Sequence, residues 1–287
     1  MQILAGTVTS GPALAVAPEA AADSIFMLTP SASADAILEA GNNVFQICFK
    51  DTNQGFASAD YFAAKFPEAT IGVIYDSSDA YSAGIAAGFL AKAEELGLNV
   101  VSTTTFTTDS QTDFSVQIAD AQANGADLVF LPMYYDAASL IMTQANAIAY
   151  DPIFFGVDGM DGILTVEGFD TALAEGVILL TPFSADAQDE ATVNFVTKYQ
   201  EAYNEIPNQF AADAYDCVYA CYNAFKETGL ETSASAADIC EAMVAQFAGG
   251  FSYDVLTAAN AMKWQATGEV DKMPAVYVIE GGKYVEK

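Results

Sequence analysis

Short apolar runs alternate with helix-compatible segments along most of the 287-residue chain. Runs rich in β-branched residues, such as Thr70 to Tyr75, predict strands that are buried on both faces. Longer segments with an apolar period near 3.6, such as Tyr81 to Leu96 before Gly97, predict amphipathic helices. Strands and helices that alternate in this way predict an α/β fold, in which helices flank doubly wound parallel sheets.

The change of rhythm near residue 183 predicts two lobes. Strands are predicted at 3–5, 25–28, 44–49, 70–75, 99–106, 127–133, 152–157 and 176–182. Helices are predicted at 11–22, 54–66, 81–96, 113–124, 136–149, 162–174, 189–203, 211–228 and 235–247, before a hairpin at 274–279 and 283–285. We expect residues 1–51 and 182–273 to form lobe 1, and residues 52–181 and 274–287 to form lobe 2. A cleft between two such lobes is the usual place for a ligand.

Small hydroxyl residues follow the first two predicted strands. Thr9 and Ser10 come after the strand at 3–5, and Ser31 and Ser33 come after the strand at 25–28. The carboxyl ends of parallel strands meet at one edge of a sheet, where backbone N–H groups at helix starts favour an anion. The two loops therefore suit a small carboxylate. Alternatively, these hydroxyl groups only cap helices.

The composition excludes several classes of function. The chain contains no His, and its nine basic residues are all Lys, against 38 acids and a formal net charge of −29. Nucleic acid and anionic membrane surfaces need clustered basic residues, so neither is an expected partner. Without His there is no Ser-His-Asp machinery, and no glycine-rich nucleotide fingerprint occurs. We expect neither an enzyme nor a cofactor.

The cysteines and the glycine-rich acidic turn give no metal site. Cys217 and Cys221 stand four residues apart on a predicted helix, and together with Cys48 and Cys240 they read as small apolar core residues. The turn that begins at Asp158 lacks the spacing of a calcium-binding EF-hand loop. No apolar run reaches the 18 residues of a membrane span.

The order and spacing of several motifs resemble the Leu/Ile/Val-binding family. These are type I periplasmic binding proteins, the extracytoplasmic receptors of branched-chain amino acid ABC transporters. The motifs that carry the resemblance are Gly6 to Gly11, Leu14 to Pro18, Thr29 to Ser33, Phe45 to Phe49 with Asp51 and Gln54-Gly55, Tyr75-Asp76 with Tyr81, Pro132 to Tyr135, Gly156 to Gly159, Phe210 to Asp216, Met262 to Glu269 with Lys272, and Glu280 to Val285.

The resemblance implies a site for a neutral amino acid. On lobe 1, Ser10 and Ser33 match hydroxyl positions that hold the ligand carboxylate, and Ser31 matches a position of backbone contacts. On lobe 2, Tyr81 and Tyr134 match aromatic residues that close over the ligand. Asp158 matches the acid that pairs with the α-ammonium group, where the family commonly carries the longer Glu. Thr9 and Phe210 fall near the wall of the side-chain pocket.

Each of these positions has a plainer alternative. The two tyrosines could be surface aromatics, Asp158 could serve a turn, and Asp51 could cap a helix.

The resemblance further implies a receptor that closes about hinges near Asp51, Thr181 and Pro274, and that presents its closed form to a membrane permease. Calorimetry with leucine, isoleucine and valine would test this expectation.

The chain also departs from the family's pattern. Family members have two βα units before the strand seen here at Ile3, and the printed sequence shows neither these units nor a signal peptide or lipid-attachment Cys. We therefore expect either a fragment or truncated product, or a missing part that another chain supplies. We expect an incomplete lobe 1 with an exposed sheet edge, through which a homodimer could form. Light scattering tests that expectation. Two other functions remain open: a sensor domain for an amide or another small organic acid, and a truncated remnant that binds nothing.

Overall fold

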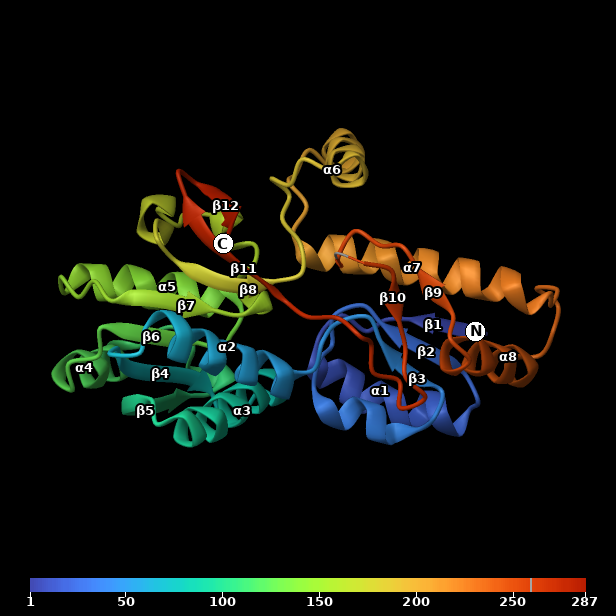
Figure 1. Ribbon diagram of the computed structural model, residues 1–287, viewed down its shortest axis with the longest axis horizontal. Helices are drawn as coiled ribbons and strands as arrows, with labels where there is room; N and C mark the ends of the chain where they lie inside the picture. The colour runs from blue at the N-terminus through green and yellow to red at the C-terminus, as the bar shows by residue number, and fades with distance from the viewer. Residues whose placement is uncertain (259) are drawn as a thin grey trace. The chain divides into compact units, whose positions relative to one another are not determined.

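The computed structural model describes residues 1–258 and 260–287 and consists of two compact units (Figure 1). The first unit comprises Met1–Lys50 and Gln209–Met273, and the second comprises Asp51–Asn208 and Pro274–Lys287. Residues 182–208, which the sequence assigned to lobe 1, therefore belong to the second unit. The reason is local: Tyr284 donates its backbone N–H to Asp186 (3.2 Å) and accepts a hydrogen bond from Ser184 at its carbonyl (3.5 Å).

The first unit is built on a parallel sheet of three strands. Its elements are β1 (Ile3–Ala5), α1 (Ser10–Ala22), β2 (Phe26–Thr29), the short 3-10 helix η1 (Asp35–Ala40), β3 (Val44–Gln46), α7 (Gln209–Thr228) and α8 (Ala236–Ala248), and the strand order is β1-β2-β3. Side chains alternate along β2: Phe26 and Leu28 pack with α7 and α8, whereas Met27 packs with the alanines of α1. Helices thus cover both faces of this sheet (Figure 1).

The two edges of the first sheet differ. Beside β3, the backbone N–H of Gln46 donates to the carbonyl of Gly268 (3.0 Å), in a segment that also contains the short antiparallel pair β9 (Ser252–Tyr253) and β10 (Met262–Lys263). Beside β1, within residues 1–258 and 260–287, no strand pairs on the side away from β2. Strand β1 is therefore an edge strand of this sheet, with Ile3 and Leu4 half-buried and Ala5 exposed. The incomplete lobe 1 and the homodimer through its edge stay predictions.

The second unit contains a seven-stranded sheet in the order β12-β11-β8-β7-β6-β4-β5. Its strands are β4 (Thr70–Asp76), β5 (Asn99–Phe106), β6 (Leu128–Leu131), β7 (Ile153–Gly156), β8 (Ile178–Thr181), β11 (Ala275–Glu280) and β12 (Lys283–Glu286). The strands from β4 to β8 are parallel, and β11 and β12 form an antiparallel edge. The expected α/β fold is confirmed, with a mixed sheet in this unit.

The second unit also contains five helices. They are α2 (Asp51–Lys65), α3 (Ala80–Leu96), α4 (Ser115–Ala123), α5 (Tyr135–Ala147) and α6 (Glu190–Tyr203), with the 3-10 helix η2 at Thr108–Ser110. Phe62 of α2 and Phe89 of α3 pack on one face of the sheet, and Ile118 of α4 and Ile141 of α5 pack on the other.

One predicted helix does not form. Residues 162–174, expected to be helical, contain only the 3-10 turns η4 (Ile163–Thr165) and η5 (Thr171–Ala174), after η3 (Asp158–Met160). Gly162 and Gly168 have φ values of +114° and +78°, which lie in the left-handed region and interrupt a right-handed helix. The apolar pattern correctly predicted that residues of this segment are buried, since Ile163 and Ala174 belong to the core. It was wrong about the α-helix.

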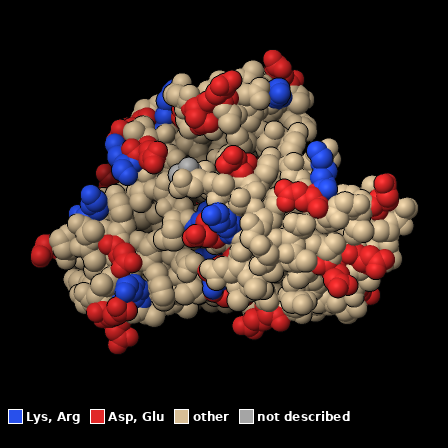
Figure 2. All heavy atoms as spheres, turned by 45° about the vertical axis from the view of Figure 1, so that its right-hand side comes forward, with Lys and Arg blue, Asp and Glu red and all other residues tan. Residues whose placement is uncertain are grey.

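The cysteines and the charges agree with the sequence analysis. All four cysteines lie in the described part of the chain, where they are buried and form no disulfide bond, as expected for core residues. On the face drawn in Figure 2, acidic side chains lie scattered among uncharged ones, and basic side chains lie among them. Within the described ranges, no helix is both long and apolar enough to span a membrane.

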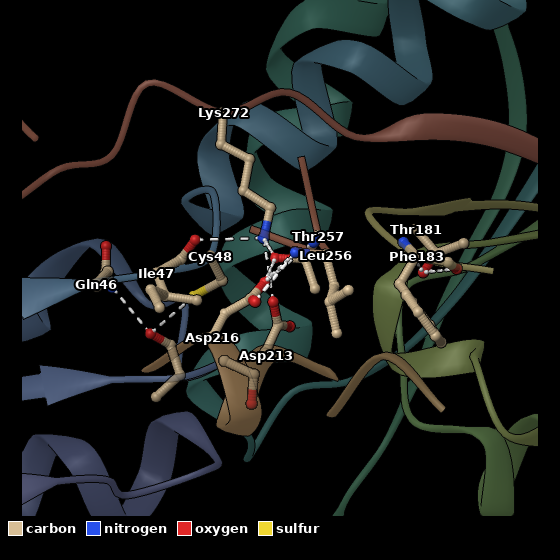
Figure 3. A network of polar contacts seen from close by, with 12 residues as sticks. Gln46, Ile47, Cys48, Thr181, Phe183, Asp213, Asp216, Leu256, Thr257 and Lys272 are labelled. Atoms are coloured by element: carbon tan, nitrogen blue, oxygen red, sulfur yellow. Dashed lines mark hydrogen bonds and ion pairs between the residues drawn. The ribbon is translucent and has the colours of Figure 1, made fainter. Parts of the chain in front are cut away.

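The most deeply buried charges of the first unit surround Lys272 (Figure 3). Its Nζ donates to Asp213 Oδ1 (3.0 Å), to Thr257 Oγ1 (2.7 Å) and to the carbonyl of Ile47 (3.4 Å). Asp216 accepts hydrogen bonds from the backbone N–H groups of Leu256 and Thr257. Burial raises the pKa of the Asp213 carboxyl to about 6, although Lys272 acts in the opposite direction. The network joins Leu256, Thr257 and Lys272 to α7.

This raised pKa predicts how the stability of the first unit depends on pH. The native state binds the Asp213 proton more tightly than the unfolded chain does, so the free energy of unfolding falls as pH rises from about 4 to 6. From the 3.8 of an ordinary Asp to about 6, this group accounts for about 3 kcal/mol. Urea unfolding followed by the fluorescence of Trp264, the single Trp of the chain, measures the effect. Asp213→Asn should remove that part of the pH dependence, and an identical pH profile for the variant would contradict the prediction.

Candidate functional site

In the first unit, side-chain hydrogen bonds join the loop after β1 to the loop after β2. Thr29 Oγ1 donates to the carbonyl of Thr7 (2.8 Å), and Ser31 Oγ donates to the carbonyl of Val8 (2.7 Å). The two loops follow neighbouring parallel strands, so short hydroxyl side chains suffice to bridge them. The structure thus brings together the hydroxyl residues that the sequence analysis singled out, and it gives the Ser31 side chain a structural task.

Ser10 and Ser33 lie at the centre of this loop pair. Ser10 Oγ accepts hydrogen bonds from the backbone N–H groups of Ser33 (3.2 Å) and Ala34 (3.1 Å), which leaves its proton for another acceptor. Ser33 is completely buried, and its Oγ has no hydrogen-bond partner among the described residues. Two hydroxyl donors, Ser10 at the start of α1 and Ser33 in the loop after β2, are therefore available to a ligand oxygen.

The remaining candidates of the first unit are placed less centrally. Thr9 is the N-cap residue of α1, yet its side chain makes no capping hydrogen bond. Phe210 lies in the first turn of α7 and is partly exposed. The simple helix-cap alternative therefore does not account for Thr9 or for Ser10, since Ser10 Oγ binds the neighbouring loop.

In the second unit, three candidate residues from different elements meet. The rings of Tyr81 and Tyr134 stack with centroids 4.7 Å apart, at the starts of α3 and α5. The Tyr81 hydroxyl donates a hydrogen bond to Asp158 Oδ1 and accepts one from the backbone N–H of Gly159 (2.8 Å). Tyr81 is only 2% exposed, so the alternative of a surface aromatic is wrong for this residue.

The electrostatics keep Tyr81 protonated. Its pKa lies well above the usual value, because burial disfavours the phenolate and because the nearby Asp158 repels a second negative charge. Asp51, at the start of α2, acts in the same direction. The Tyr81 hydroxyl therefore remains a donor to Asp158 at any physiological pH, and it fixes the orientation of that carboxylate.

Gln54 is a member of this cluster to which the sequence analysis assigned no role. Its Oε1 accepts a hydrogen bond from the backbone N–H of Asp158 (3.3 Å), so α2 helps to hold the acid in place. The signal was present in Gln54-Gly55, which carried part of the family resemblance. No local pattern indicated that residues 54 and 158, which lie 104 positions apart, would meet.

Glycines allow this cluster to be compact. A Cβ atom at Gly159 would lie 2.6 Å from the Tyr81 hydroxyl and 3.0 Å from the carbonyl of Met133. At Gly55 it would lie 2.5 Å from the backbone of both Ile85 and Phe89, so only glycine lets α2 and α3 approach this closely. The sequence carries these glycines because neighbouring atoms occupy the space of a side chain.

The two sets of residues differ in their chemistry. The first unit offers uncharged donors near a helix start, which suit a carboxylate. The second offers a buried carboxylate with a stacked aromatic pair, which suits a cation next to an apolar group. Over the described part of the chain, no group of three or more His, Cys, Asp or Glu side chains is arranged to hold a metal ion.

Comparison with known proteins assigns the family. The family model described as periplasmic binding protein matches residues 1–283. A Leu/Ile/Val-binding protein of Rhizobium johnstonii is 25% identical over 287 residues, which cover 99% of this chain and 75% of that protein. The crystal structure of a leucine binding protein from Thermotoga maritima is similar with a TM-score of 0.85 and 25% identity, covering 100% of this chain and 79% of the other.

A third protein has the same fold and a different kind of ligand. It is a solute binding protein of an ABC transporter from R. palustris in complex with benzoate, with a TM-score of 0.86, 22% identity and coverage of 99% of this chain and 76% of the other. The family expected from the sequence is confirmed by the match over residues 1–283. The chain belongs to the periplasmic binding protein family, whose members are substrate-binding proteins of transporters and not enzymes.

Proposed function

We propose that this protein binds a neutral amino acid of the branched-chain type and delivers it to the membrane permease of an ABC transporter. The ligand carboxylate accepts hydrogen bonds from Ser10 and Ser33, and its α-ammonium group pairs with Asp158. The stacked rings of Tyr81 and Tyr134 cover the ligand. Ser31 contributes through its backbone, and Thr9 and Phe210 border the ligand side chain. The place of action is extracytoplasmic, as for the family.

The buried hydroxyl of Ser33 is the observation that carries this proposal. A buried hydroxyl without a partner costs free energy, which a ligand oxygen would recover. Asp158 supports the proposal, because a zwitterion needs an acid as well as donors. The names of the relatives agree with the ligand class, since two of them are called leucine or Leu/Ile/Val-binding proteins.

Isothermal calorimetry with leucine, isoleucine and valine tests the proposal. We expect saturable binding of at least one of them, and Ser33→Ala should weaken it about 10-fold through the loss of one hydrogen bond to a charged group. Ser110→Ala, which removes an exposed hydroxyl of η2, is the matched control and should leave the affinity unchanged. If neither heat nor a thermal shift accompanies any of the three amino acids, this ligand class is wrong.

A small aromatic acid is the second candidate ligand. The benzoate complex of the R. palustris protein favours it, as does the Tyr81–Tyr134 pair, which offers a stacking surface. Such a ligand has no ammonium group, so Asp158 would oppose its binding. Benzoate in the same calorimetric series separates the two candidates, because only an amino acid site binds leucine and rejects benzoate.

A further inference from the structure

The loop that carries Ser33 is held on both sides by side chains. Ser10 Oγ accepts hydrogen bonds from the backbone N–H groups of Ser33 and Ala34. On the other side, Gln46 Nε2 donates to the carbonyls of Ala32 (3.0 Å) and Ala34 (3.3 Å). The Cys48 thiol adds a contact to the Ala32 carbonyl (3.3 Å), which Figure 3 shows together with that of Gln46. The backbone before and after Ser33 is therefore tied to β3 and to the residues that follow it.

Gln46 is itself fixed through its backbone. Its carbonyl accepts a hydrogen bond from Trp264 Nε1 (2.7 Å), and its N–H donates to the carbonyl of Gly268 (3.0 Å). A Cβ atom at Gly268 would lie 2.3 Å from the carbonyl of Val44, so this segment lies directly against β3. Because the backbone of Gln46 is clamped and its side chain is completely buried, the position of Nε2 is determined before any ligand arrives.

The Oε1 atom of the Gln46 amide indicates the role of this side chain. Its Oε1 is buried and has no hydrogen-bond partner within residues 1–258 and 260–287. A buried carbonyl oxygen without a partner costs free energy, and an apolar side chain of the same size would avoid that cost. The two hydrogen bonds that Nε2 donates across the Ser33 loop are the gain that offsets it.

We infer that Gln46 is a positioning residue for Ser33, and through Ser33 for the carboxylate of the ligand. Gln46 holds the carbonyls of the loop while Ser10 holds its N–H groups, so the Ser33 hydroxyl is directed by both. This inference rests on the proposed function only where it concerns the ligand carboxylate. The effect of Gln46 on the Ser33 loop can be measured on the protein without a ligand.

The first experiment uses no ligand. Amide hydrogen exchange over residues 30–36 is followed by mass spectrometry in the wild type, in Gln46→Met and in Gln46→Glu. Met keeps the length of the side chain without its donors, and Glu replaces the Nε2 donors by an acceptor at neutral pH. We expect both variants to exchange about 10-fold faster in this segment. Gln265→Met, the same change on an exposed side chain of the first unit, should match the wild type. Trp264 fluorescence verifies that each variant is folded.

The second experiment measures leucine affinity by calorimetry in the same proteins. Gln46→Met should weaken leucine binding about 10-fold, while the binding of leucinamide, which has no carboxylate, should change much less. Unchanged exchange over residues 30–36 in both folded variants would overturn the inference. If the wild type binds no leucine but the variants exchange faster, the proposed ligand is wrong and the positioning role of Gln46 stands. If Gln46→Met weakens the binding of leucine and of leucinamide equally, Gln46 does not position Ser33 for the ligand carboxylate.

Discussion

Replacing Asp158 by Asn is expected to weaken leucine binding about 100-fold or more, the largest effect on affinity that we predict. The change removes the only charge that we assign to the α-ammonium group of the ligand. The fold should survive, because the amide oxygen of the new side chain can still accept the hydrogen bond from Tyr81, and the backbone N–H can still donate to Gln54. Calorimetry gives the affinity, and thermal unfolding gives the stability of the variant.

The control for this prediction is Asp151→Asn, which removes the same charge from an exposed position of the second unit. It should bind leucine as the wild type does, so that a general change of net charge is excluded. Full leucine affinity in the Asp158→Asn variant would refute the pairing of Asp158 with the ammonium group. Tighter binding of benzoate by the same variant would favour the aromatic acid as the ligand.

Replacing Gly55 by Ala should destabilise the second unit by about 3 kcal/mol. In most helix positions this change is favourable by up to about 1 kcal/mol, because alanine is the better helix former. Here the new methyl group would lie 2.5 Å from the backbone atoms Ile85 O and Phe89 N. Backbone atoms, unlike a side chain, cannot relieve the clash by a change of rotamer. The helices α2 and α3 must then separate, and Gln54 and Tyr81 move with them.

Scanning calorimetry measures this loss of stability. The matched control is Gly11→Ala in α1, where no atom lies within 4 Å of the added Cβ, and which should be neutral or slightly stabilising. Leucine binding by the Gly55→Ala variant should also weaken, since two residues of the site lie on the displaced helices. An unfolding temperature equal to that of the wild type would show that α2 and α3 tolerate a wider spacing.

Much of the fold was predictable because buried positions recur along the sequence with the period of a strand or a helix. The continuous apolar run from Thr70 forms β4 of the buried sheet, and the pattern that ends at Gly97 forms α3, with Gly97 in the left-handed conformation at its C-terminus. Residues 162–174 show the limit of this periodicity, because the positive φ angles of two glycines override the apolar pattern. The boundary expected near Thr181 also differs, since hydrogen bonds to Tyr284 keep residues 182–208 in the second unit.

The sequence by itself determined the kind of chemistry that the protein can perform. The absence of His and Arg removed most catalytic and anion-clamping machinery, and the motifs around Ser10, Ser33, Tyr81, Tyr134 and Asp158 pointed to the family and to candidate ligand contacts. Such information is local, because it lies in residue types and in their spacing along one chain.

Only the tertiary structure decided which residues support those candidates. Gln54 meets Asp158, and Gln46 meets the Ser33 loop, through hydrogen bonds between segments that no periodicity connects. An amide side chain can donate or accept almost anywhere, so its type predicts no partner. Its role follows from which backbone groups the fold leaves within about 3 Å of it, and this is fixed by the packing of strands and helices distant in sequence.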